Sequence, residues 1–235
     1  MLRLFSTPQW FQGWDIIFDV VSLIVAFLIA AYTYRLYRVQ RENRLAYFSF
    51  AFLLVALGFL AKAFTSSVVY FFPVRETVLD VLRPAVGARL IYTNLYYRAA
   101  FFIQMLSLLG AWLLIFFISQ KPRDRLRKYY EVSQIALFVY LLFLISVFSN
   151  VRYYVFYLTS SVLLGLIVLN YYKNYLNTDK NWNSFLVMLS FLLILAGNLL
   201  FVFVFLIPGI YVLGEALILG GFLALLYTYR KVTRK

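Results

Sequence analysis

Ionisable and amide side chains interrupt the apolar stretches of this 235-residue chain at only a few positions. The most notable are Asp15, Asp19, Lys62, Gln104, Asn198 and Glu215. Polar groups inside hydrocarbon are costly, so such side chains usually face the interior of a helix bundle and pair with one another. An ammonium near carboxylates can form a buried ion pair, and it can also bind or exchange a proton. These are the chemistries that the sequence offers.

The absence of two residue types excludes much catalytic chemistry. The chain has no Cys and no His. Disulfides, thiolate nucleophiles, Cys/His zinc sites, His-dependent triads and His-ligated haem are therefore excluded. No clustered Asp and no Gly-rich phosphate loop occurs, and single carboxylates on separate helices do not identify an acid–base pair. We expect a chain that is not an enzyme and that has no metal site and no cofactor.

The composition is that of a protein embedded in a membrane. Hydrophobic residues make up 64% and charged residues 13% of the chain, against about 45–50% and about 25% in soluble domains. Seven segments reach the length of about 20 mainly apolar residues that a spanning helix needs. They are residues 14–37, 46–72, 99–119, 131–149, 153–172, 185–207 and 210–229.

Helices rather than strands must form these spans. Residues 185–207 are apolar all round, whereas strands of a membrane barrel alternate apolar and polar side chains. The expected fold is all-α, a seven-transmembrane helix bundle in one transmembrane domain, residues 1–235. Only Pro208 and Gly209 divide the last two spans, and this pair predicts a tight turn. We expect a multi-pass protein of the cell membrane.

The distribution of Lys and Arg predicts the orientation. Most of the 22 basic residues lie in segments 35–44, 121–128, 173–180 and 230–235, which alternate with less basic loops. Cytoplasmic loops carry such an excess, so we expect the N-terminus outside and the C-terminus in the cytoplasm. The net charge of +13 then indicates contact with anionic lipid at the cytoplasmic face rather than nucleic-acid binding. The densest block contains Lys121, Arg123, Arg125, Arg127 and Lys128. This block is either a lipid anchor or a docking patch for a protein partner.

The long external loop, residues 73–98, contains a predicted amphipathic helix over residues 74–83. Valines and Leu82 lie near one face of this helix, and charged residues lie mostly on the other. Such a helix is expected to rest on the outer membrane surface. It would be either a surface helix or, more specifically, a lid over an outward-facing cavity.

The spans also suggest an internal duplication of 3+1+3 helices. The first two spans can be laid on the fifth and sixth without a gap, with Arg38 on Lys173 and Pro73 on Pro208. At the level of topology, this plan resembles the small sugar transporters of the SWEET and PQ-loop type. It also resembles seven-helix sensors, including rhodopsin-like receptors and the membrane input modules of bacterial and archaeal signalling proteins. The Pro-Gln pair of PQ-loop proteins occurs here only at Pro8-Gln9, before the first span, and this departure weighs against the transporter family. Residues 210–229 contain no Lys that could hold retinal, which weighs against a retinal pigment.

The depths of five polar residues agree with one another. Asp19, Gln104 and Glu215 each lie five residues inside the outer end of their predicted span, about 7–8 Å deep. Lys62 and Asn198 lie nearer the midplane. In a bundle whose helices follow in chain order, the first, second and last helices adjoin, so we expect Lys62 to pair with Glu215 first or with Asp19 second. The five residues either only neutralise one another and join helices, or they line an outward-open pocket for a small ligand or a proton.

Three functions remain open at this point. The first is a seven-helix receptor or sensor-like module that signals through a separate cytoplasmic partner. The second is a transporter of a small solute, which can be proton-coupled. The third is a non-catalytic subunit of a membrane complex. The outer layer of polar residues and the basic cytoplasmic loops favour the first, with the ligand unknown.

Overall fold

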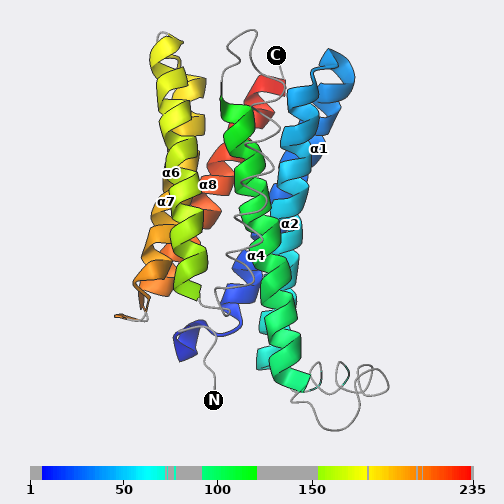
Figure 1. Ribbon diagram of the computed structural model, residues 1–235, viewed down its shortest axis with the longest axis vertical. Helices are drawn as coiled ribbons and strands as arrows, with labels where there is room; N and C mark the ends of the chain where they lie inside the picture. The colour runs from blue at the N-terminus through cyan, green and yellow to red at the C-terminus, as the bar shows by residue number, and fades with distance from the viewer. Residues whose placement is uncertain are drawn as a thin grey trace.

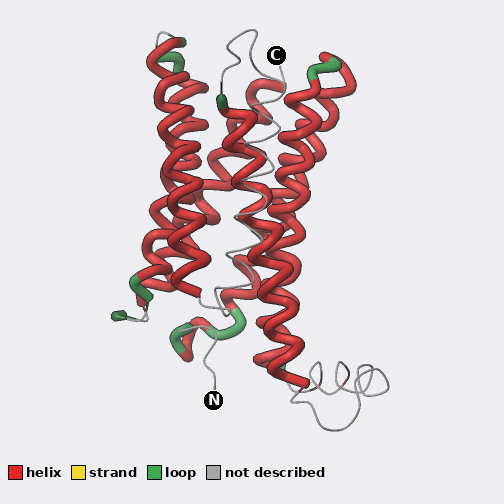
Figure 2. The backbone as a smooth tube through the Cα atoms, in the orientation of Figure 1, coloured by secondary structure: helices red, strands yellow, loops and turns green. Residues whose placement is uncertain are grey.

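The computed structural model of the chain is an elongated bundle of long helices (Figure 1). The structure describes residues 7–71, 73, 77, 92–120, 153–178, 180–204, 206–207 and 209–233. Within these ranges every regular element is helical (Figure 2). The elements are the 3-10 helix η1 (Gln9–Phe11) and the α-helices α1 (Trp14–Gln40), α2 (Asn43–Tyr70), α4 (Tyr92–Ser119), α6 (Tyr153–Asn177), α7 (Trp182–Val202) and α8 (Gly209–Thr233).

All six of these α-helices are long and apolar enough to cross a membrane. The chain is therefore an all-α, multi-pass membrane protein. The six helices correspond to the spans predicted to begin at residues 14, 46, 99, 153, 185 and 210. The seventh predicted span, residues 131–149, lies outside the described residues, as do most of the predicted surface helix, residues 74–83, and the basic block, residues 121–128.

Several helix ends differ from the predicted spans. Helix α4 begins at Tyr92, so residues 92–98 are helical and do not belong to the predicted external loop. No Pro or Gly separates Tyr92 from Ala99, and nothing in the sequence stops the helix there. Helix α7 ends at Val202, before the predicted residue 207. The chain then turns through hydrogen bonds such as Phe203 N–H to Leu200 O. Pro208 disfavours helical backbone at Ile207, so the helix is not favoured as far as the predicted end of the span.

The six helices form a closed ring in chain order. Each helix packs against the next, and α8 packs against α1. Helices α4 and α6 run parallel, since Phe101 in the third turn of α4 contacts Phe156 in the first turn of α6. Farther along both helices, Asn170 of α6 donates to Oγ of Ser119, the last residue of α4. Helix α4 therefore ends, and α6 begins, at opposite ends of the bundle (Figure 1).

Side chains fill the middle of the ring. Phe222 of α8 is fully buried and packs against Phe52 and Phe59 of α2 and Trp112 of α4. Aromatic rings at such edge and stacked geometries add to the packing energy. This aromatic core ties α2, α4 and α8 together next to the polar residues described below.

Candidate functional site

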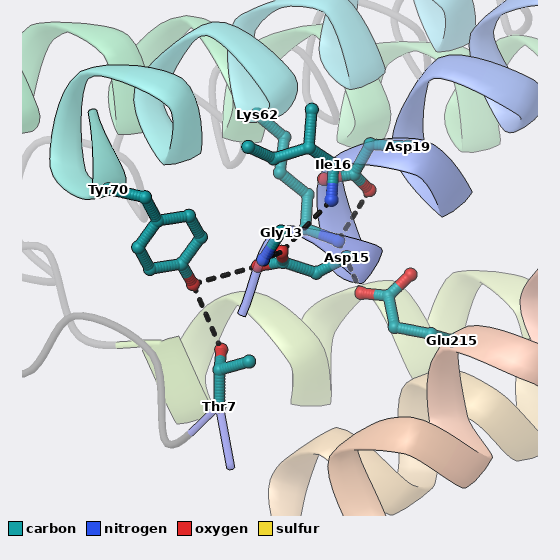
Figure 3. Close-up of polar contacts among 8 residues, drawn as sticks. All are labelled: Thr7, Gly13, Asp15, Ile16, Asp19, Lys62, Tyr70 and Glu215. Carbon is teal, nitrogen blue, oxygen red and sulfur yellow. Dashed lines mark hydrogen bonds and ion pairs between the residues drawn. The ribbon is translucent and has the colours of Figure 1, made fainter. Parts of the chain in front are cut away.

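Lys62 lies between two carboxylates that come from different helices. Its Nζ is 2.7 Å from Oδ1 of Asp19 on α1, and it also donates to Oε1 of Glu215 on α8 (Figure 3). The predicted ion pair is therefore confirmed for both partners at once, rather than for one in preference to the other. One ammonium joins α1, α2 and α8. We call Asp19, Lys62 and Glu215 the ionic cluster.

The chain order of the ring brings these three residues together. Asp19 and Glu215 lie in the second turns of α1 and α8, and Lys62 lies about two turns before the end of α2. Those three helix ends are at the same end of the bundle (Figure 1). Because α1 packs against both α2 and α8, the long Lys62 side chain can reach both carboxylates. The sequence predicts Asp19 and Glu215 at one depth and Lys62 nearer the midplane, a difference that a long lysine side chain can span.

The ionic cluster is buried. The exposed fractions are 0% for Asp19, 3% for Lys62 and 1% for Glu215. Its other close neighbours are aromatic, with Lys62 Nζ 6.0 Å from the ring centre of Phe201 and 5.8 Å from that of Tyr211. Both rings lie within the range of a cation–π contact. An isolated ammonium in such surroundings would cost several kcal/mol, and the two carboxylates offset that cost.

A small cavity adjoins the ionic cluster and collects the remaining predicted residues. Lys62, Gln104, Asn198 and Glu215 line it, together with aromatic and aliphatic side chains of the core. Its volume is about 30 Å³, which is room for one or two water molecules. Pockets for drug-sized ligands measure about 300–1,000 Å³. The cavity in this state therefore fits water-sized groups and not a sugar.

The two amides have different surroundings. Asn198 of α7 accepts a hydrogen bond from Ser160 of α6 at 3.0 Å and donates to the Ile194 carbonyl at 2.9 Å. It therefore joins two helices, as hydrogen-bonding side chains do in membranes. Gln104 of α4 is buried and faces the same cavity. All five predicted residues thus meet in one region, four around the cavity and Asp19 against Lys62.

Asp15 forms a second polar group one turn away from the ionic cluster. Its Oδ1 accepts from the backbone N–H groups of Gly13 and Ile16, each at 3.0 Å. Its Oδ2 accepts from Tyr70 Oη at 2.8 Å, and the Tyr70 hydroxyl also lies 3.4 Å from Thr7 Oγ1 (Figure 3). The carboxylate satisfies orphan N–H groups at the start of α1 and ties this end to α2.

Sequence reasoning missed the tyrosines beside the ionic cluster. Tyr211 lies one turn before Glu215 on the same face of α8, and this i, i+4 spacing is the signal that could have identified it. Tyr157 of α6 lines the cavity. Among the described residues, Asp19 Oδ2 and Tyr211 Oη are buried and have no hydrogen-bond partner. The polar region is thus incompletely satisfied at a carboxylate oxygen.

A recess at the opposite end of the bundle was not predicted either. It has a volume of about 220 Å³ and lies between α6, α7 and α8. Amide, hydroxyl and aromatic side chains line it, including Asn174, Asn183, Thr228 and Tyr229.

Within the described ranges, no group of three or more Asp or Glu is placed to hold a metal ion.

Comparison of the chain with protein families, curated proteins and solved structures finds no match. The function must therefore be inferred from the ionic cluster, the cavity and the arrangement of the helices.

Proposed function

We propose that the chain is a seven-helix sensor-like module in which the ionic cluster is the element that responds to a stimulus. The observation that carries this proposal is the single Lys62 ammonium shared by Asp19 of α1 and Glu215 of α8. A change in charge at either carboxylate alters the attraction between three helices at once. Polar clusters of this kind inside membranes commonly mark functional sites.

A seventh span is part of this proposal. Helices α4 and α6 are consecutive among the described helices and run parallel. The chain must therefore return from one end of the bundle to the other between them. Residues 131–149 are long and apolar enough for such a crossing. A 3+1+3 duplication also requires that the helices α1, α2 and α4 run in the same directions as α6, α7 and α8, respectively.

The basic residues support an orientation with the C-terminus in the cytoplasm. The α1–α2 turn, the α6–α7 turn and the end of α8 are at one end of the bundle (Figure 1). Basic side chains at that end include Arg35, Arg38, Lys173, Arg230 and Lys231. Excess basic charge is typical of the cytoplasmic side and attracts anionic lipid.

A separate partner is needed to carry the signal onward. The recess between α6, α7 and α8 lies at the basic end and offers amides and hydroxyls to a protein. The block Lys121–Lys128 remains a second candidate for the docking surface. Movement of α8, which carries both Glu215 and one wall of the recess, would connect the ionic cluster to the partner.

Distance measurements between spin labels test this function. The chain has no native Cys, so labels can be placed at Val39 of α1 and Tyr227 of α8, which are 77% and 60% exposed. Glu215→Gln releases α8 from Lys62 but leaves Lys62 paired with Asp19. We expect this change to shift the distance distribution at the basic end. The matched control, Glu42→Gln, changes an exposed carboxylate and should leave the distribution unaltered. A folded Glu215→Gln variant with wild-type distances would contradict a sensing role.

A proton-coupled transporter is the second candidate. It is favoured by the parallel course of α4 and α6, which a 3+1+3 plan requires, and by the Glu215 carboxylate, which lines a water-sized cavity. Proteoliposomes distinguish the two functions, because a transporter acidifies or alkalinises the lumen when a solute gradient is applied and a sensor does not.

A further inference from the structure

We propose that the ionic cluster binds one exchangeable proton and that Asp19 is its resting position. This inference rests on the proposed function and names the stimulus as a proton. It begins from a charge count. Lys62 supplies one positive charge, while Asp19 and Glu215 supply two negative charges when both are ionised. The cluster then carries one uncompensated negative charge.

Burial makes that uncompensated charge expensive. All three residues are at most 3% exposed, and an ion without a partner in such a medium costs several kcal/mol. One proton added to a carboxylate forms a neutral acid and brings the cluster from −1 to 0. A cation could do the same, but the Lys62 ammonium already occupies the position between the two carboxylates.

The hydrogen bonds assign the proton to Asp19. Its Oδ1 accepts from Lys62, whereas its Oδ2 is fully buried and has no partner among the described residues. A bare anionic oxygen in this position costs more than a neutral O–H group. The unpartnered oxygen belongs to a side chain that is completely buried within the cluster, so it is an independent sign that something binds there.

Among the described residues, five charged or titratable groups act on Asp19. Asp15 lies on the same helix, Lys62 faces it from α2, and Glu215 and Tyr211 face it from α8. Tyr157 approaches from α6. Lys62 is the one cation in this set, and both Asp15 and Glu215 repel an ionised Asp19. The surroundings therefore favour the neutral acid.

The cavity gives the proton a route to the cluster. Glu215 and Lys62 both line it, while Asp19 does not. A proton from cavity water can add to Glu215. Lys62 can then give one N–H proton to Asp19, and the resulting neutral amine takes the proton from Glu215, so Lys62 is again an ammonium. The transfer converts the Asp19 carboxylate to an acid and returns Glu215 to a carboxylate.

Infrared spectroscopy of the purified full chain in lipid nanodiscs tests the proposal directly. At neutral pH, we expect the C=O band of a protonated carboxyl group that shifts in D₂O. Asp19→Asn and Glu215→Gln should each abolish this band, because either change leaves one carboxylate for one ammonium. Glu42→Gln, at an exposed carboxylate, should keep it. No protonated carboxyl band in the wild-type chain would overturn the proposal without any variant having to fold.

Two further outcomes separate the possible explanations. Stabilisation by sodium chloride over choline chloride at constant pH, without the carboxyl band, would assign the missing charge to a metal cation and overturn the proton. If the carboxyl band is present but the Val39–Tyr227 distance does not respond to Glu215→Gln, the bound proton is supported and the sensor function is contradicted. A distance that responds without a band would contradict only the proton.

Discussion

Lys62 and Asp19 lie 43 positions apart in the chain, yet Nζ of Lys62 is 2.7 Å from Oδ1 of Asp19, and both residues are buried. The same ammonium donates to Glu215. The sharing of one cation by two carboxylates determines how the chain should respond to substitution, because the loss of the cation and the loss of one anion have different consequences.

Removal of the cation should destabilise the fold strongly. Lys62→Met removes the donor that Asp19 and Glu215 share and leaves a buried negative charge without a positive partner, and such a loss costs about 3–5 kcal/mol. Equilibrium unfolding in detergent micelles measures this cost. Lys173→Met, at an exposed lysine on α6, should change stability by less than about 0.5 kcal/mol. Equal effects of the two substitutions would show that Lys62 is not a structural cation.

Close approach of α7 and α8 should depend on Gly221. A Cβ at this position would lie 2.7 Å from the Ser190 carbonyl oxygen and 2.6 Å from Ile194 Cγ1. Gly221→Ala therefore forces the two helices apart, and we expect a loss of about 1–3 kcal/mol in the free energy of unfolding.

The adjacent glycine provides the control for this packing prediction. A Cβ at Gly220 meets nothing within 4 Å. Gly220→Ala should be neutral or stabilise the chain by up to about 1 kcal/mol, because Ala is the better helix former. If the two neighbouring substitutions have the same effect on thermal unfolding, the helices do not pack as described.

The hydrogen bond between Tyr70 and Asp15 should stabilise the start of α1. Tyr70→Phe removes the donor to Asp15 Oδ2 and leaves a buried carboxylate oxygen without that partner. We expect a loss of about 1–3 kcal/mol, measured by chemical unfolding. Tyr227→Phe, at a 60% exposed tyrosine, is the matched control and should leave the free energy of unfolding unchanged. A silent Tyr70→Phe would mean that water replaces the hydroxyl.

The sequence was sufficient to predict the six described spans, though not all of their ends, and the meeting of the charged residues. Long apolar segments fix the spans, and the cost of burying Lys62 alone requires a carboxylate at a similar depth, which Asp19 and Glu215 supply. The sequence did not identify a single ion-pair partner for Lys62, because both flanking helices present a carboxylate within reach of its flexible side chain. In the structure both carboxylates pair with Lys62.

Other features depend on tertiary packing that the pattern of residue types does not encode. The seven-residue extension of α4 from Tyr92 follows from the absence of a helix-breaking residue, yet hydropathy detects only the apolar part of a helix. The contacts of Gly197 and Gly221 depend on how closely α7 and α8 approach. Tyr211 is one of 20 tyrosines in the chain, and only the packing of α8 places its ring beside Lys62.

A double-mutant cycle at Asp19 and Glu215 tests the shared cation most directly. Asp19→Asn or Glu215→Gln alone leaves Lys62 with one carboxylate, so each should cost only about 1 kcal/mol in the free energy of unfolding. The double variant leaves the ammonium buried without an anion. Its cost should exceed the sum of the single costs by about 1–3 kcal/mol. Additive costs, with the double variant equal to the sum of the two single variants, would contradict the sharing of Lys62 by the two carboxylates.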